Sequence, residues 1–62
     1  MESIFSYSID DLKKYFIEKN EKPYRSTQIF EWLYRHKIKD FSEMTNQKQD
    51  IINMLKTDFS LN

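Results

Sequence analysis

The sequence predicts a small all-α domain built from three helices and a fourth helical segment of a single turn. In three separate stretches, apolar residues recur at the three- and four-residue spacing of an amphipathic helix. Glycine is absent and proline occurs once, so the tight hairpin turns that need glycine are not expected. The chain has 62 residues and no linker-like or repeated segment. We therefore treat residues 1–62 as a single helical domain with a small core.

The first predicted helix spans residues 9–19. Its apolar residues at helical spacing are Ile9, Leu12 and Phe16. Ser8 is a favourable N-cap, and Asp11 follows at the three-residue spacing of a capping box. Asn20 is expected to end the helix. Residues 1–7 are expected to be irregular, with their apolar side chains packed against it.

The second predicted helix begins at Arg25 or Ser26 and ends at His36 or Lys37. Pro23 lies in the turn before it and disfavours helix at the preceding residue. Cations at the far end would complement the helix dipole. The stripe expected to be buried consists of Ile29, Phe30 and Leu33, and the aromatic flanks consist of Trp32 and Tyr34.

A single helical turn and a last helix complete the prediction. Asp40 and Glu43 have capping-box spacing, so one turn is expected over residues 41–44. Asn46 is expected to cap a helix over residues 47–58. The predicted core combines apolar residues from all these elements, namely Phe16, Phe30, Leu33, Phe41, Met44, Ile51 and Leu55.

Positive charge is concentrated in the middle of a chain whose net charge is zero. Five of the ten basic residues, with one acidic residue, lie between Lys22 and Lys39. Lys and Arg neutralise phosphates and aromatic rings stack on unpaired bases, so this segment is a candidate RNA-binding surface. A plainer interpretation stays open, in which Arg35 pairs with Glu31 and Tyr34 flanks the core. The predicted RNA-binding residues are Lys22, Tyr24, Arg25, Gln28, Arg35 and Lys37.

The residues predict neither a catalytic site nor a metal site. His36 has no Asp, Ser or Cys at a spacing typical of a triad. Asp10 and Asp11 fall in the first turn of a predicted helix, where they compensate its dipole. The sequence has no Cys and no His, Asp and Glu cluster with metal-ligand spacing. It also lacks a membrane span and a signal-peptide pattern, so a cytoplasmic protein is expected.

Two linked motifs carry a family resemblance. Residues 22–34 read Lys-Pro-Tyr-Arg-x-x-Gln-Ile-Phe-Glu-Trp-Leu-Tyr, and residues 40–46 read Asp-Phe-Ser-Glu-Met-Thr-Asn. With this spacing they resemble the N-terminal accessory domain of RlmN-type dual-specificity RNA methyltransferases. The resemblance extends over nearly the whole chain, from the opening Ser-Ile-Phe-Ser-Tyr-Ser to Phe59.

The resemblance implies a helix-hairpin-helix-like accessory domain of a larger enzyme. Enzymes of this family use radical-SAM chemistry to methylate C2 of an adenine in 23S rRNA and in some tRNAs. The chain would then be a monomeric fragment whose partners are 23S rRNA, tRNA and a catalytic barrel in the same polypeptide. The complete protein would use S-adenosylmethionine and a 4Fe–4S cluster. This chain has no Cys, so no cofactor is expected within it.

Two positions depart from the family pattern. Gln47 stands where the family usually has an apolar residue, and Lys48 stands where it usually has a capping Ser. Capping is therefore expected from Asn46, with a looser junction before the last helix. The chain also lacks the Gly-containing hairpin that binds phosphates in true helix-hairpin-helix modules.

The hypothesis that joins these observations is an RNA-recognition and positioning domain that is not itself an enzyme. A second hypothesis is a helical interaction module that docks on the catalytic barrel without touching nucleic acid, with Trp32 and Tyr34 as anchors. A free-standing DNA-binding domain is a third. The second helix has too few exposed Arg, Asn and Gln residues to favour that last hypothesis.

Overall fold

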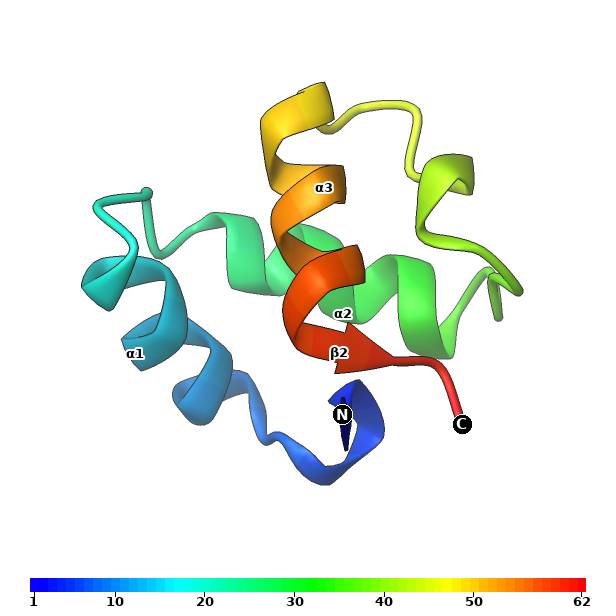
Figure 1. Cartoon of the computed structure of the whole chain (residues 1–62), viewed down its shortest axis with the longest axis horizontal. Helices are drawn as coiled ribbons and strands as arrows, with labels where there is room; N and C mark the ends of the chain where they lie inside the picture. Colours follow the sequence, from blue (N-terminus) through cyan, green and yellow to red (C-terminus); the bar gives the residue numbers. More distant parts are fainter. The chain divides into compact units, whose positions relative to one another are not determined.

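The computed structural model describes all 62 residues and confirms a mainly helical fold. No helix combines the length and the apolar character that crossing a membrane requires. The chain divides into two compact units, residues 7–37 and residues 1–6 with 38–62, which we describe separately. The elements are β1 (Glu2–Ser3), η1 (Ile4–Ser6), α1 (Ile9–Glu18), α2 (Arg25–Tyr34), η2 (Phe41–Glu43), α3 (Gln49–Asp58) and β2 (Phe59–Ser60) (Figure 1).

Helix α1 begins with the predicted capping box. The backbone N–H of Asp11 donates to the Ser8 hydroxyl at 3.1 Å, and the Asp11 carboxylate accepts the backbone N–H of Ser8 at 2.9 Å. The backbone N–H of Ser8, and after it the Ser8 side chain, lower the pKa of Asp11 because both stabilise its charged carboxylate. The helix ends one residue earlier than predicted. Asn20 follows it in the left-handed conformation, with φ of 59°.

Helices α1 and α2 are neighbours within the unit of residues 7–37. The buried stripe of α2 consists of Ser26, Ile29 and Leu33, which follow the i, i+3, i+7 spacing of one helix face. The prediction that Phe30 belongs to this stripe is wrong, because Phe30 is only partly buried. Each residue turns about 100° around a helix, so Phe30 projects well to one side of Ile29.

Helix α2 ends earlier than predicted. Its last residue is Tyr34, and Arg35 is the C-cap. Lys37 adopts the left-handed conformation, with φ of 52°, which is incompatible with a continuing helix. The three residues expected in the last turn, Arg35, His36 and Lys37, therefore follow the helix.

The second unit brings the two ends of the chain together. Strand β1 pairs in parallel with β2, with Glu2 opposite Phe59 and Ser3 opposite Ser60 (Figure 1). The prediction of an irregular start is thus wrong for residues 2–6. Ile4 is fully buried and belongs to this unit, not to that of α1. The other buried apolar residues of the unit are Ile38, Phe41, Met44, Ile51, Ile52, Leu55 and Phe59.

The single turn η2 also carries its predicted capping box. Asp40 Oδ1 accepts the backbone N–H of Ser42 at 2.8 Å, and Glu43 Oε2 accepts that of Asp40 at 2.9 Å. The Ser42 hydroxyl donates to Asp40 Oδ1 at 2.6 Å. This side-chain bond is the main reason that the pKa of Asp40 lies below its usual value.

Helix α3 begins two residues later than predicted, at Gln49. Its N-cap is Lys48, whose side chain makes no capping hydrogen bond, so the predicted Asn46 cap is wrong. The backbone N–H of Gln47 donates to the Met44 carbonyl at 3.0 Å, which holds this segment in a turn before the helix. Gln47 is buried, and its Nε2 donates to Asn46 Oδ1 at 3.1 Å.

Replacing Lys48 with a capping residue should stabilise the fold. Lys48 has an extended backbone, with φ of −63° and ψ of 150°, which is the conformation that a Ser N-cap adopts. Lys48→Ser is therefore expected to raise the free energy of unfolding by about 1 kcal/mol relative to Lys48→Ala. Urea denaturation of both variants measures the difference. Equal stability of the two would contradict the assignment of Lys48 as the N-cap.

Candidate nucleic-acid interface

The predicted RNA-binding residues all belong to the unit of residues 7–37, so they can be described within one body. They form two groups at opposite ends of α2. The first consists of Lys22, Tyr24, Arg25 and Gln28, and the second of Arg35 and Lys37. Helix α2 has 10 residues, so about 15 Å separates its ends. One phosphate cannot contact both groups.

In the first group, Arg25 is the least available residue. Its side chain is 12% exposed, and its Nε lies 3.5 Å from Glu21 Oε1. Its guanidinium also lies 5.5 Å from the centre of the Tyr24 ring, within cation–π range. Lys22 and Tyr24 are exposed, whereas Gln28 is partly buried. Lys22 and Tyr24 are therefore the best placed of this group to contact an RNA.

In the second group, Arg35 both forms an ion pair and remains accessible. Arg35 Nη1 lies 3.0 Å from Glu31 Oε1, which confirms the pairing expected across one helical turn. The Arg35 side chain is nevertheless 76% exposed. An exposed pair at this spacing contributes only about 0.3–0.5 kcal/mol, so a phosphate can replace Glu31 at small cost. Lys37 is also exposed.

A shallow hollow adjoins this second group. It is lined by Phe30, Glu31, Tyr34 and Arg35. The Phe30 and Tyr34 ring centroids are 5.1 Å apart with the rings tilted by 49°, and Tyr34 is 50% exposed. This site was not predicted from the sequence, because Phe30 was assigned to the core. The sequence does contain a signal for it. Phe30 and Tyr34 form an aromatic pair at i,i+4 spacing, and Glu31 and Arg35 form an ionic pair at the same spacing one residue later.

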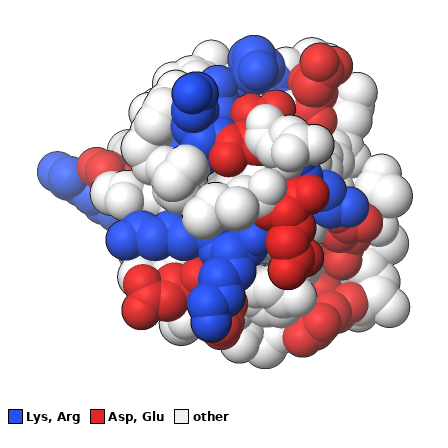
Figure 2. All heavy atoms as spheres, turned by 90° about the vertical axis from the view of Figure 1, so that its left-hand side faces the viewer, with Lys and Arg blue, Asp and Glu red and all other residues white.

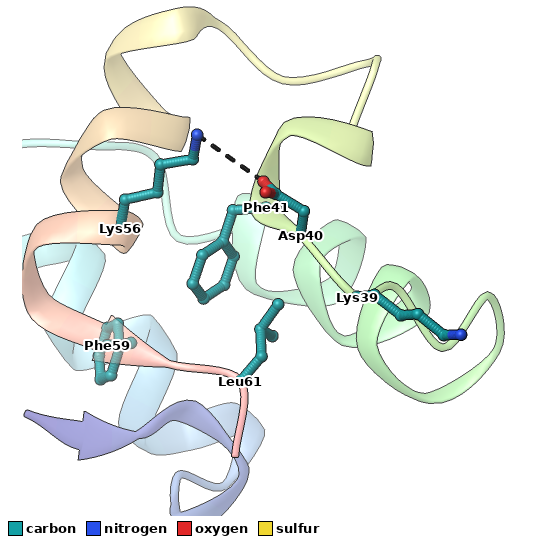
Figure 3. A pocket seen from close by; sticks show the side chains of 6 residues that line it. All are labelled: Lys39, Asp40, Phe41, Lys56, Phe59 and Leu61. Atoms are coloured by element: carbon teal, nitrogen blue, oxygen red, sulfur yellow. Dashed lines mark ion pairs between the residues drawn. The ribbon is translucent and has the colours of Figure 1, made fainter.

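A different hollow lies in the unit that holds the chain ends (Figure 3). Lys56 Nζ lies 3.7 Å from Asp40 Oδ1, and Figure 3 shows Lys39 extending away from this pair. Apolar side chains complete the lining, and they are Phe41, Phe59 and Leu61. Its one carboxylate already accepts hydrogen bonds from Ser42, so the lining offers no unengaged general base.

Charge does not separate into a basic patch on the face of the molecule that Figure 2 presents. Figure 2 shows basic side chains interleaved with acidic ones on the face that it presents.

No group of three or more His, Cys, Asp or Glu side chains could hold a metal ion. The His36 ring lies 4.6 Å from that of Trp32, an aromatic neighbour that cannot exchange protons with it. The exposed residues at the two ends of α2 therefore remain the candidate contact residues of this unit.

The chain is similar to known RNA methyltransferases. Residues 3–61 match the family described as "Ribosomal RNA large subunit methyltransferase N-terminal domain". Proteins named "Probable dual-specificity RNA methyltransferase RlmN" from Geobacillus kaustophilus and Bacillus subtilis are 42% identical over 59 residues. The one from Streptococcus mutans is 45% identical over 60 residues. These alignments cover 95–97% of this chain and 16–17% of the relatives, so the chain spans about a sixth of their length.

A solved structure has the same fold. It is the crystal structure of a radical SAM methyltransferase from Sphaerobacter thermophilus, which the chain matches with a TM-score of 0.94. The match covers 100% of this chain and 18% of that one, at 24% sequence identity. At this identity the likeness concerns the fold.

Proposed function

Because the chain belongs to the family of the ribosomal RNA large subunit methyltransferase N-terminal domain, we propose that it recognises and positions RNA for an adenine-C2 methyltransferase. The chain would be the N-terminal part of a longer, cytoplasmic and monomeric enzyme. It would hold 23S rRNA or tRNA so that the target adenine reaches a catalytic barrel in the same polypeptide. The relatives are named as RNA methyltransferases, which supports RNA as the substrate class.

The observation that carries this role is the pair of exposed basic ends on α2. Lys22 lies before the helix, and Arg35 and Lys37 lie after it. Cations that flank a helix about 15 Å long can contact different phosphates of one RNA strand. Exposed tyrosines accompany both ends, namely Tyr24 and Tyr34, and each offers a ring for an unpaired base.

The chemistry of methyl transfer would lie outside these residues. In the proposed longer protein, S-adenosylmethionine and a 4Fe–4S cluster would supply the radical reaction. Such a cluster requires cysteine thiolates, and the 62 residues contain none. These residues therefore do not fit the cluster, and we assign them no catalytic step.

A salt-dependent titration tests the RNA-binding role. The 62-residue chain is titrated with a tRNA anticodon stem-loop and followed by NMR. We expect shifts at both ends of α2 and an affinity that falls as salt rises, with a log–log slope of about −2 to −3 for three phosphate contacts. Shifts confined to α1, or an affinity independent of salt, would contradict the proposal.

A second candidate function is a module that docks on the catalytic barrel. The apolar hollow of Phe30 and Tyr34 favours it, since aromatic side chains are frequent anchors of protein interfaces. Trp32, which is partly buried, would be a further anchor. In this case RNA affinity would not depend on the cations at the ends of α2.

A further inference from the structure

We propose that the hollow of Phe30 and Tyr34 is a stacking site for one unpaired nucleobase, with Arg35 placed to bind the adjoining phosphate. This inference rests on the proposed RNA-binding function. It adds a defined binding site and a preference for unpaired over paired RNA.

The geometry of the two rings decides how a base would bind. A base inserted between two rings needs centroids about 7 Å apart, because each stacked contact takes about 3.5 Å. The Phe30 and Tyr34 centroids are 5.1 Å apart and tilted by 49°, so nothing fits between them. The base must instead lie on the outer surface of the pair, against the half-exposed Tyr34 ring. Phe30 would support that ring from the side.

The surroundings of the rings favour a nucleotide over a protein partner. The hollow is lined by three residues of α2 and by its C-cap, Arg35. A contact confined to these residues would bury far less surface than the roughly 800 Å² that each partner of a stable protein complex buries. A single base has the appropriate size. Arg35 lies on the lining, its pair with Glu31 is exposed, and Lys37 adds positive charge two residues on. The base and its phosphate would thus find complementary groups side by side.

The test compares Tyr34→Ala with Tyr34→Phe on two RNA ligands. One ligand is an RNA hairpin with an unpaired loop, and the other is a blunt duplex of the same length. Tyr34→Ala is expected to weaken hairpin binding by roughly 5- to 100-fold. Tyr34→Phe keeps the ring and is expected to bind like the unmodified chain. Neither variant should change duplex affinity or the salt slope, because no charge is removed.

Ile17→Ala is the matched control. Ile17 is an apolar side chain of α1 in the same unit, 58% exposed, and it lies outside the hollow. This variant should bind both RNAs like the unmodified chain. In the unmodified chain, the Phe30 and Tyr34 ring resonances should shift on adding the hairpin and not on adding the duplex. This NMR measurement decides the matter if Tyr34→Ala fails to fold.

The outcomes separate this inference from the proposed function. If the unmodified chain binds the hairpin and Tyr34→Ala binds it equally well, the stacking site is wrong and RNA binding stands. If Tyr34→Phe loses as much hairpin affinity as Tyr34→Ala, the effect comes from the hydroxyl, and the stacking site is wrong. If the unmodified chain binds neither RNA, both proposals fall. Ring shifts without RNA, on adding the catalytic region of the longer protein, would assign the hollow to a protein contact instead.

Discussion

Leu33→Ala is expected to remove most of the stability of the chain. Leu33 lies in the buried stripe of α2, and truncating a buried Leu to Ala costs about 2–5 kcal/mol. A domain of 62 residues has a free energy of unfolding of about 3–9 kcal/mol. The stability lost in Leu33→Ala is therefore comparable with the whole free energy of unfolding of the chain. Urea denaturation followed by circular dichroism measures it as a lower midpoint with a similar slope.

Phe30→Ala is the matched comparison on the same helix. Phe30 is only partly buried, so part of its ring already contacts water in the folded state. Its truncation is expected to cost about 1–2 kcal/mol, less than that of Leu33 despite the larger side chain. If Phe30→Ala were the more damaging variant, the buried stripe would include Phe30 and the hollow would be misassigned.

Features that depend on nearby residues could be predicted from the sequence. Both capping boxes were found because each requires two residues three positions apart, Ser8 with Asp11 and Asp40 with Glu43. The pairing of β1 with β2 could not be found in this way. It joins opposite ends of the chain, and two-residue strands are too short to show an alternating pattern.

Helix ends were predicted less well because the usual signals are missing. With no glycine in the chain, Asn20 and Lys37 take the left-handed positions that end the helical segments. Nothing in the sequence distinguishes Lys37 from a lysine in a last helical turn. Similarly, Lys48 is an N-cap without a capping side chain, so the pattern favoured Asn46 instead.

The candidate site, too, was predictable in part from the sequence. The concentration of charge around α2 could be read from the sequence, since it depends only on residue types. Arg25 is largely buried with its Nε 3.5 Å from Glu21, and the hollow depends on how Phe30 is turned relative to Ile29. Both are consequences of where α2 begins and which face it buries. The sequence therefore indicates the segment, and the structure ranks the residues within it.

Reversing the charges after α2 is expected to reduce RNA affinity strongly without unfolding the chain. Arg35→Glu with Lys37→Glu replaces two exposed cations by anions. At low salt the loss should be on the order of 100-fold, and the salt slope should become shallower by about 2, one unit for each phosphate contact removed. Binding to a tRNA anticodon stem-loop at several salt concentrations measures both quantities.

Lys13→Glu with Lys14→Glu is the control that separates local from overall charge. These two lysines are exposed on α1 in the same unit, and their reversal changes the net charge by the same amount. If only the variant after α2 loses affinity, Arg35 and Lys37 contact the RNA. If both variants lose it equally, the effect is a general repulsion, and the assignment of these residues is wrong. If neither variant loses RNA affinity, the docking function is favoured, because a contact with the catalytic barrel through aromatic anchors does not require these cations.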